Sequence, residues 1–117
     1  MANNYFDTIS AIATPFQTGA VGIIRISGEK AFEIISKIFK GKKIEPEKIC
    51  YGWIVDNKQK IDEVIVLAFE NPKSFTGEDV IEINCHGGIY VTRSILNLLL
   101  EKLLLDKHMH KTKWQLI

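Results

Sequence analysis

Apolar residues recur along the chain with two spacings, one typical of strands and one typical of helices. Alternation at every second position, or a short run that is apolar on both faces, predicts strands over residues 7–14, 21–27, 49–55, 63–69 and 80–85. Apolar positions three and four residues apart predict helices over residues 29–39 and 90–105. In this order the elements predict a single α+β domain, in which two main helices pack on a mixed β-sheet.

Two of these elements carry further information. Polar residues 56–60 separate the strands 49–55 and 63–69, which predicts a hairpin. Strand 63–69 is apolar on both faces, as is typical of a central strand that is covered on both sides. The helix over 90–105 is too polar and too short for a membrane span, so no membrane partner is expected.

The predicted strand 80–85 has two chemically different faces. Its alternation places Ile81, Ile83 and Cys85 on one side and Val80, Glu82 and Asn84 on the other. A carboxylate in the middle of an apolar strand costs several kcal/mol unless it is exposed or receives hydrogen bonds, so Glu82 needs partners. The glycines that follow, at 87 and 88, allow a tight turn into the next helix.

Arg25 lies in the middle of the predicted strand 21–27 and raises the same question as Glu82. The two side chains could form a cross-strand ion pair inside the sheet, or they could hold a polar ligand. From these residues alone the ion pair is the preferred interpretation, because polar pairs commonly stabilise strand pairing.

The charge of the chain gives no general indication of a partner. Its formal net charge is +1, from 15 basic and 14 acidic residues. Such a balance provides no overall attraction to nucleic acid or to an anionic membrane. The basic run Lys37, Lys40, Lys42 and Lys43 is more typical of a solvated helix end than of a surface that reads RNA.

The two cysteines, Cys50 and Cys85, are too few for a disulfide framework, and no signal-peptide pattern is present. A reducing, cytoplasmic setting is therefore expected. Cys85 falls on the core face of its strand, which favours a buried structural thiol over a nucleophile. A metal site using Cys85, His86, His108 and His110 lacks any recognised ligand spacing, so no metal site is predicted.

No catalytic residue is predicted either. A Ser–His or Cys–His nucleophile pair lacks the third group that would orient the base. The glycines at 19, 22 and 28 do not form the G-x-x-x-x-G-K-[ST] phosphate loop, which occurs nowhere in the chain. We therefore expect no GTP binding by that motif and no catalytic activity of this chain alone.

Three stretches, DTISAIATPF, VGIIRISG and SFTGEDVIEINCHGG, closely resemble the N-terminal domain of the tRNA modification GTPase family, also called MnmE or TrmE. The resemblance runs in the family's order from residue 7 to about residue 100. It implies a fold similar to the tetrahydrofolate-binding fold of the aminomethyltransferases. GTP, Mg²⁺ and K⁺ belong to a separate GTPase domain of that family, which these residues do not include.

The resemblance also implies a ligand and partners. In this family the N-terminal domain forms a homodimer and binds a tetrahydrofolate derivative, 5-formyl or 5,10-methylene, as the one-carbon source for wobble-uridine modification of tRNA. A flavin-dependent protein is its partner in that process. The family's folate-contacting Arg falls on Arg25 and its folate-contacting Glu on Glu82. With the resemblance, folate binding replaces the ion pair as the preferred interpretation of these two residues.

Residues 1–102 are expected to form the folate-binding and dimerisation domain, and residues 103–117 a divergent tail. The expected folate pocket contains Arg25 and Glu82 and is roofed by the turn at residues 86–88. A further Lys of the family site lies beyond the point of divergence and has no counterpart here. The alternative is a structural self-association domain without functional folate binding.

Overall fold

The computed structural model describes residues 8–12, 22–71, 77–86 and 88–105. It contains the strands β1 (Ile9–Ile12), β2 (Gly22–Ser27), β3 (Phe39–Gly41), β4 (Ile49–Asp56), β5 (Gln59–Phe69) and β6 (Val80–Cys85), and the helices α1 (Ala31–Ser36) and α2 (Gly88–Leu105). The predicted α+β class is confirmed. In the described part of the chain, no helix is long and apolar enough to cross a bilayer.

The strands form one six-stranded sheet in the order β1-β2-β6-β5-β4-β3. Every neighbouring pair is antiparallel, whereas the sequence predicted a mixed sheet. Strand β6 pairs with β2 on one side and with β5 on the other, so it lies inside the sheet although it is the last strand in the chain. This central position places the polar face of β6 between two neighbouring strands.

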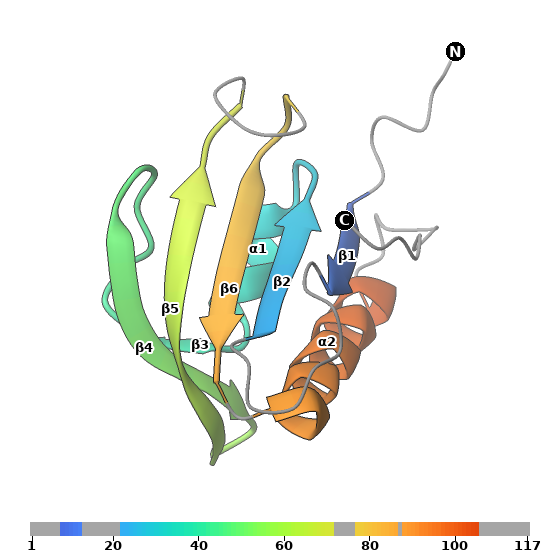
Figure 1. Cartoon of the computed structure of the whole chain (residues 1–117). Helices are drawn as coiled ribbons and strands as arrows, with labels where there is room; N and C mark the ends of the chain where they lie inside the picture. The colour runs from blue at the N-terminus through green and yellow to red at the C-terminus, as the bar shows by residue number, and fades with distance from the viewer. Residues whose placement is uncertain (1–7, 13–21, 72–76, 87, 106–117) are drawn as a thin grey trace.

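Both helices pack against the same face of the sheet (Figure 1). That face supplies the core, in which alternate residues of the central strands, such as Ile24, Val66 and Ile83, are fully buried. Helix α2 adds Ile95, Leu99 and Leu103, which are likewise fully buried. The strands therefore bury one set of alternate residues, as the period-two pattern requires.

The predicted helix over 29–39 is wrong in its extent. Helix α1 ends at Ser36, and Phe39 begins the short edge strand β3. The backbone N–H of Val55 donates to the carbonyl of Ile38 at 2.8 Å and draws the chain into the sheet. The ring of Phe39 fits against Gly52 on β4, where any side chain would overlap it. This pairing with a distant strand overrides the local helical pattern.

The β4–β5 hairpin is confirmed, and β5 is longer than predicted because it begins at Gln59. Asn57 adopts a positive φ of 58° in its turn, a conformation that asparagine tolerates. The expectation that residues 63–69 are covered on both faces is wrong. Val64, Val66 and Ala68 are buried, whereas the opposite face of the strand is only half-buried.

We call this second side of the sheet the open face. Its half-buried apolar residues include Ile23, Ile65, Leu67 and Phe69. Neither described helix covers it. The predicted divergent tail, residues 103–117, lies largely outside the described residues. Gly87, part of the predicted turn at residues 86–88, lies wholly outside them. Helix α2 itself continues to Leu105, past the expected domain boundary at residue 103.

Candidate ligand site on the open sheet face

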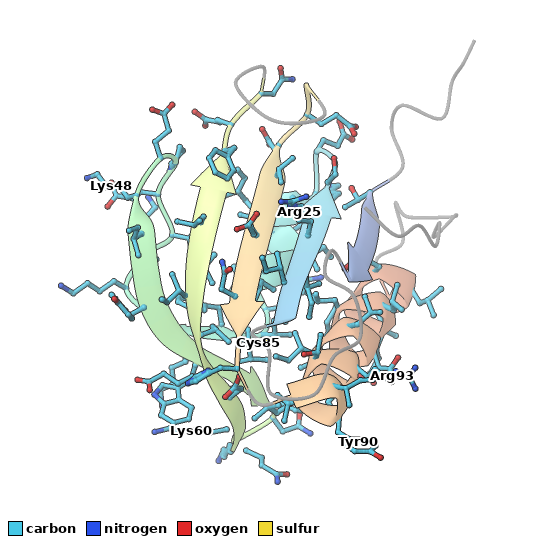
Figure 2. All side chains as sticks on the ribbon, viewed as in Figure 1. Arg25, Lys48, Lys60, Cys85, Tyr90 and Arg93 are labelled. Atoms are coloured by element: carbon cyan, nitrogen blue, oxygen red, sulfur yellow. The ribbon has the colours of Figure 1, made fainter. Side chains whose placement is uncertain are left out.

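Arg25 and Glu82 lie directly opposite each other on β2 and β6. Their side chains meet on the open face, where Arg25 Nε donates to Glu82 Oε1 at 3.0 Å. Figure 2 labels Arg25 on β2 beside β6. The structure therefore brings together the two site residues that the sequence predicted, although they are far apart in the chain. The contact itself is common to the ion-pair and the ligand interpretations.

The Glu82 carboxylate is held on both oxygens. Asn84, two residues along the same face of β6, donates its Nδ2 to Glu82 Oε2 at 3.3 Å. Glu82 is only 8% exposed, and the side chain of Arg25 is 24% exposed. A carboxylate accepts up to about four hydrogen bonds, whereas the described residues supply two, one to each oxygen. The nearly buried carboxylate is thus stabilised by its neighbours, and the described residues leave capacity for two further N–H donors.

Apolar residues surround this polar group. Leu67 lies opposite Glu82 on β5, and Ile23 and Ile65 flank Asn84 on the two neighbouring strands. All three are half-buried. A charged group within a low-dielectric surface interacts more strongly with a partner than it does in water. The open face therefore combines an oriented carboxylate and guanidinium with flat apolar surface, a combination suited to a planar polar ring.

The junction between β6 and α2 is fixed by Asp62 at the edge of the hairpin. Asp62 Oδ2 accepts the backbone N–H of His86 at 3.0 Å and lies 3.5 Å from His86 Nδ1. His86 is exposed, and it lines a hollow of about 320 Å³ together with Tyr51, Ile65 and Asn84. Asn84 thus contacts both Glu82 and this hollow, whereas neither Arg25 nor Glu82 lines it.

Sequence reasoning did not assign roles to Asp62 and Asn84. For Asn84 a signal was available, because it shares the polar face of its strand with Glu82 at a separation of two residues. For Asp62 no local signal exists, because its partner His86 is distant in the sequence and directly follows the end of another strand, β6. Such a contact emerges only from the pairing of β5 with β6.

Both cysteines are buried and carry free thiols, which confirms the structural interpretation of Cys85. Cys85 Sγ lies 3.5 Å from the Gly22 carbonyl and 3.4 Å from Thr92 Oγ1. Burial raises the pKa of the Cys85 thiol. The pKa of the Cys50 thiol is also raised, mainly by burial and to a smaller extent by the negative charge of Glu45. A raised pKa keeps a thiol protonated and unreactive. Within the described ranges, no group of His, Cys, Asp and Glu is arranged to hold a metal ion.

The fold and the site together define an antiparallel α+β domain with an oriented Arg–Glu pair on an uncovered sheet face. A family model described as "GTP-binding protein TrmE N-terminus" matches residues 8–111. The chain belongs to this family. The match covers most of the chain and extends beyond residue 103.

Curated relatives agree with this assignment. The chain is 58% identical over 103 residues to a "tRNA modification GTPase MnmE" of Streptococcus mutans, covering 86% of this chain and 23% of that protein. It is 54% identical to proteins of the same name from Streptococcus thermophilus and Acetivibrio thermocellus, covering 81% and 82% of this chain and 22% of each relative. The chain therefore spans less than a quarter of the length of these relatives.

Proposed function

We propose that this chain is the reduced-folate-binding and self-associating N-terminal module of a tRNA modification GTPase. The observation that carries the proposal is the nearly buried Glu82 carboxylate, held by Arg25 and Asn84 on a face that the described helices leave uncovered. The names of the relatives support the wider assignment to tRNA modification. The ligand is a tetrahydrofolate derivative with a 5-formyl or 5,10-methylene group.

Glu82 would recognise the pterin. A pterin ring presents a ring N–H beside an exocyclic amino group, and a single carboxylate can accept both in a bidentate manner. Charge-assisted bonds of this kind are about twice as strong as neutral ones. The two bonds that Glu82 already accepts orient its carboxylate before the ligand arrives, which lowers the entropic cost of binding.

Arg25 would act beside it. Its Nε–H donates to Glu82, and its guanidinium, a planar fork with five N–H donors, would also donate to a formyl or ring carbonyl oxygen in the complex. The planar guanidinium fork suits such oxygen acceptors better than a lysine ammonium does. Arg25 therefore has two roles in this proposal, positioning the carboxylate and contacting the ligand.

The open face also supports self-association as a homodimer. It exposes large apolar side chains, with Ile49 at 66% and Tyr51 at 68% of their accessible area. Together with half-buried Ile65, Leu67 and Phe69, they form an apolar surface that water contacts unfavourably. Pairing with a second copy would cover this surface and enclose the Arg25–Glu82 pair, which would strengthen its hydrogen bonds to a ligand.

In the full-length protein this module would supply the one-carbon group for wobble-uridine modification of tRNA in the cytoplasm. A flavin-dependent protein would be its partner. GTP, Mg²⁺ and K⁺ would act in a separate GTPase domain. No step of catalysis is assigned to the residues of this chain.

A second candidate function is self-association without folate binding. One observation favours it, because Arg25 and Asn84 of the same chain each donate a hydrogen bond to one oxygen of Glu82. In that case the pair contributes only to strand pairing and stability.

Calorimetric titration with 5-formyltetrahydrofolate separates the two functions. The parent should bind with 1:1 stoichiometry per chain, and Glu82→Ala should weaken binding by roughly 2 to 4 kcal/mol. Glu101→Ala is the matched control, since it removes an exposed carboxylate from α2 on the helix side of the sheet. Absence of heat in a folded, dimeric parent would favour the second function. Equal affinities for all three proteins would place the ligand away from Glu82.

A further inference from the structure

Strand β3 forms one edge of the sheet, and no described strand lies beyond it. The sequence predicted a solvated helix end for the lysines around it, which is wrong for most of them. The structure places only Lys37 there, as the C-cap of α1. Lys40 belongs to β3, and Lys42 and Lys43 directly follow that strand. These residues therefore flank a sheet edge rather than a helix end.

The chain on either side of β3 turns its carbonyl groups toward β4. Just before the strand, the carbonyl of Ile38 accepts the backbone N–H of Val55 at 2.8 Å. Just after it, the carbonyl of Lys42 accepts a hydrogen bond from Cys50 Sγ at 3.2 Å. Positions 38 and 42 thus both face the neighbouring strand. In an antiparallel ladder alternate residues direct their backbone groups to opposite sides, so position 40 faces β4 as well.

The two remaining residues of β3 direct their backbone groups away from the sheet. Lys40 pairs with Trp53, which lies directly opposite it on β4. The N–H and C=O groups of Phe39 and Gly41 then point to the outer side of the edge. Gly41 is exposed. A row of outward N–H and C=O groups is a template for pairing with another strand. Strand β3 therefore offers two residues, each with one donor and one acceptor, to an extended peptide.

An apolar hollow of about 300 Å³ lies beside this edge. Phe32, Phe39 and Ile44 line it, and all three are half-buried and pack against the rim of the core. Phe39 lies opposite the fully buried Ile54, which places the hollow on the helix side of the sheet. Its volume is at the lower end of the range for ligand pockets, about 300 to 1,000 Å³. The hollow suits a single large apolar side chain.

Two lysines border the hollow without a counter-charge. Lys42 and Lys43 line it, are exposed, and form no ion pair with any residue that the structure describes. None of the described residues that line the hollow is acidic. Neighbouring ammonium groups repel each other, and carboxylates of a bound partner would relieve that repulsion. The charge of the edge is therefore complementary to an acidic partner.

We propose that this edge, the β3 edge site, binds an extended acidic segment of a second protein by strand addition. The site consists of Phe32, Phe39, Gly41, Lys42, Lys43 and Ile44. The backbone of the segment pairs with β3, one apolar side chain enters the hollow, and acidic residues beside it meet the lysines. In this mode of recognition main-chain hydrogen bonds provide affinity, and pockets for alternate side chains provide specificity.

Gly41 determines where the apolar side chain of the segment lies. Residues directly opposite each other in a ladder point to the same face, so a residue opposite Gly41 points to the helix side. It meets no side chain of Gly41, and the Phe39 ring approaches to 2.9 Å from the place that a Cβ of Gly41 would occupy. The apolar side chain therefore contacts the Phe39 ring across the edge. Because β3 has three residues, the paired segment is short.

A second copy of this chain fits the β3 edge site poorly. Pairing of β3 with its own copy would bring Lys42 and Lys43 close to the same lysines, and such like-charge contacts are unfavourable. The site also lies apart from the open face, where the folate and homodimer proposals are based. Arg25 and Glu82 belong to other strands, so binding at this edge depends on neither proposal.

The test is fluorescence anisotropy with the labelled peptide Asp-Glu-Thr-Phe-Thr-Glu-Asp, at about 50 mM salt, where charges are little screened. Replacing its Phe by Ser preserves the charge and should weaken binding about tenfold or more, because burial of the ring is lost. Methylating the Phe nitrogen removes a donor to β3 and should weaken binding about threefold or more. Methylating the preceding Thr nitrogen, which faces away from β3, should have little effect.

Variants of the protein test the lysines. K42Q/K43Q should weaken binding of the acidic peptide about threefold or more, because two ion pairs are lost. The matched control is K58Q/K102Q, which removes the same charge from the hairpin turn and from α2 and should retain the parent affinity. Lys42 and Lys43 lie outside the strands, so circular dichroism should show that their variant is folded.

Hydrogen exchange followed by NMR locates the bound peptide. The amides of Phe39 and Gly41 should exchange more slowly in the complex, whereas the amide of Lys40, which faces β4, should change little. Slower exchange at the two outward residues would support strand addition. No binding by the parent, equal affinity for the Phe and Ser peptides, equal losses in the two lysine variants, or unchanged exchange at Phe39 and Gly41 would each overturn the proposal.

Discussion

Removing either member of the Arg25–Glu82 pair should have unequal effects on stability. In Arg25→Ala the Glu82 carboxylate remains, 8% exposed, with Asn84 as its remaining described donor. Breaking a buried pair in this way typically costs about 3 to 5 kcal/mol, and the lower figure applies because Arg25 is partly exposed. In Glu82→Ala the guanidinium remains and reaches solvent, so the loss should be about 1 kcal/mol.

The double variant provides the decisive comparison. With both charges removed, no buried carboxylate is left unpaired, so R25A/E82A should be more stable than R25A by about 1 to 2 kcal/mol. Adding a second truncation would thus restore stability, a result that independent side chains cannot produce.

Urea denaturation followed by circular dichroism measures these differences. All four proteins should be compared at one protein concentration, because self-association would add to apparent stability. Equal m-values would show that each variant unfolds from the same compact state. Additive losses in the double variant would refute the conclusion that Glu82 depends on Arg25 for compensation.

Four further outcomes are expected. Purified protein should show no GTP hydrolysis above background in a phosphate-release assay, because the sequence contains no phosphate loop. Gly52→Ala should lower stability by about 1 to 3 kcal/mol in urea denaturation, because the new Cβ would overlap the Phe39 ring and lie 2.6 Å from the Lys40 carbonyl oxygen. Burial raises the pKa of the Cys85 thiol in the folded protein, so the unfolded chain loses this proton at a lower pH. The free energy of unfolding should therefore fall as the pH rises above about 8.5, and Cys85→Ala should reduce this dependence. Leu67→Glu on the open face should shift sedimentation from dimer to monomer while circular dichroism stays unchanged.

The sequence predicted those elements whose patterns are local. Alternation in β6 separates Ile83 from Glu82, and the structure places the first in the core and the second on the open face. The hairpin and helix α2 likewise follow from turn residues and from leucines at helical spacing. Each of these features depends on neighbours within a few positions of the chain.

Features that depend on distant partners were not predicted. Phe39 fits a helical pattern, but it enters β3 because Gly52 leaves room for its ring on the neighbouring strand. The apolar odd-numbered residues of β5 suggested a covered strand, whereas the two helices pack on the opposite side. Composition alone does not distinguish a face covered by the same chain from one that a second molecule would cover.

The site also combines features that local patterns predict with features that depend on distant strands. Arg25 and Glu82 were conspicuous as charges within apolar strands, and their pairing follows once β2 and β6 are adjacent. The lysines near Lys40 were interpreted through a helix that ends earlier than predicted, so their relation to Trp53 became visible only in the sheet. Strand order, which no local pattern encodes, determines which side chains meet.

The most direct test of the folate proposal is a two-dimensional NMR titration that follows side-chain N–H groups. On addition of 5-formyltetrahydrofolate, the Arg25 Nε–H and Asn84 Nδ2 resonances should shift in a saturable manner, because both groups bond the carboxylate that would receive the pterin. Pterin protons should show nuclear Overhauser contacts to Leu67 on the neighbouring strand. Saturable shifts confined to residues away from β2, β5 and β6, or no shifts at all in the folded protein, would contradict the proposed site.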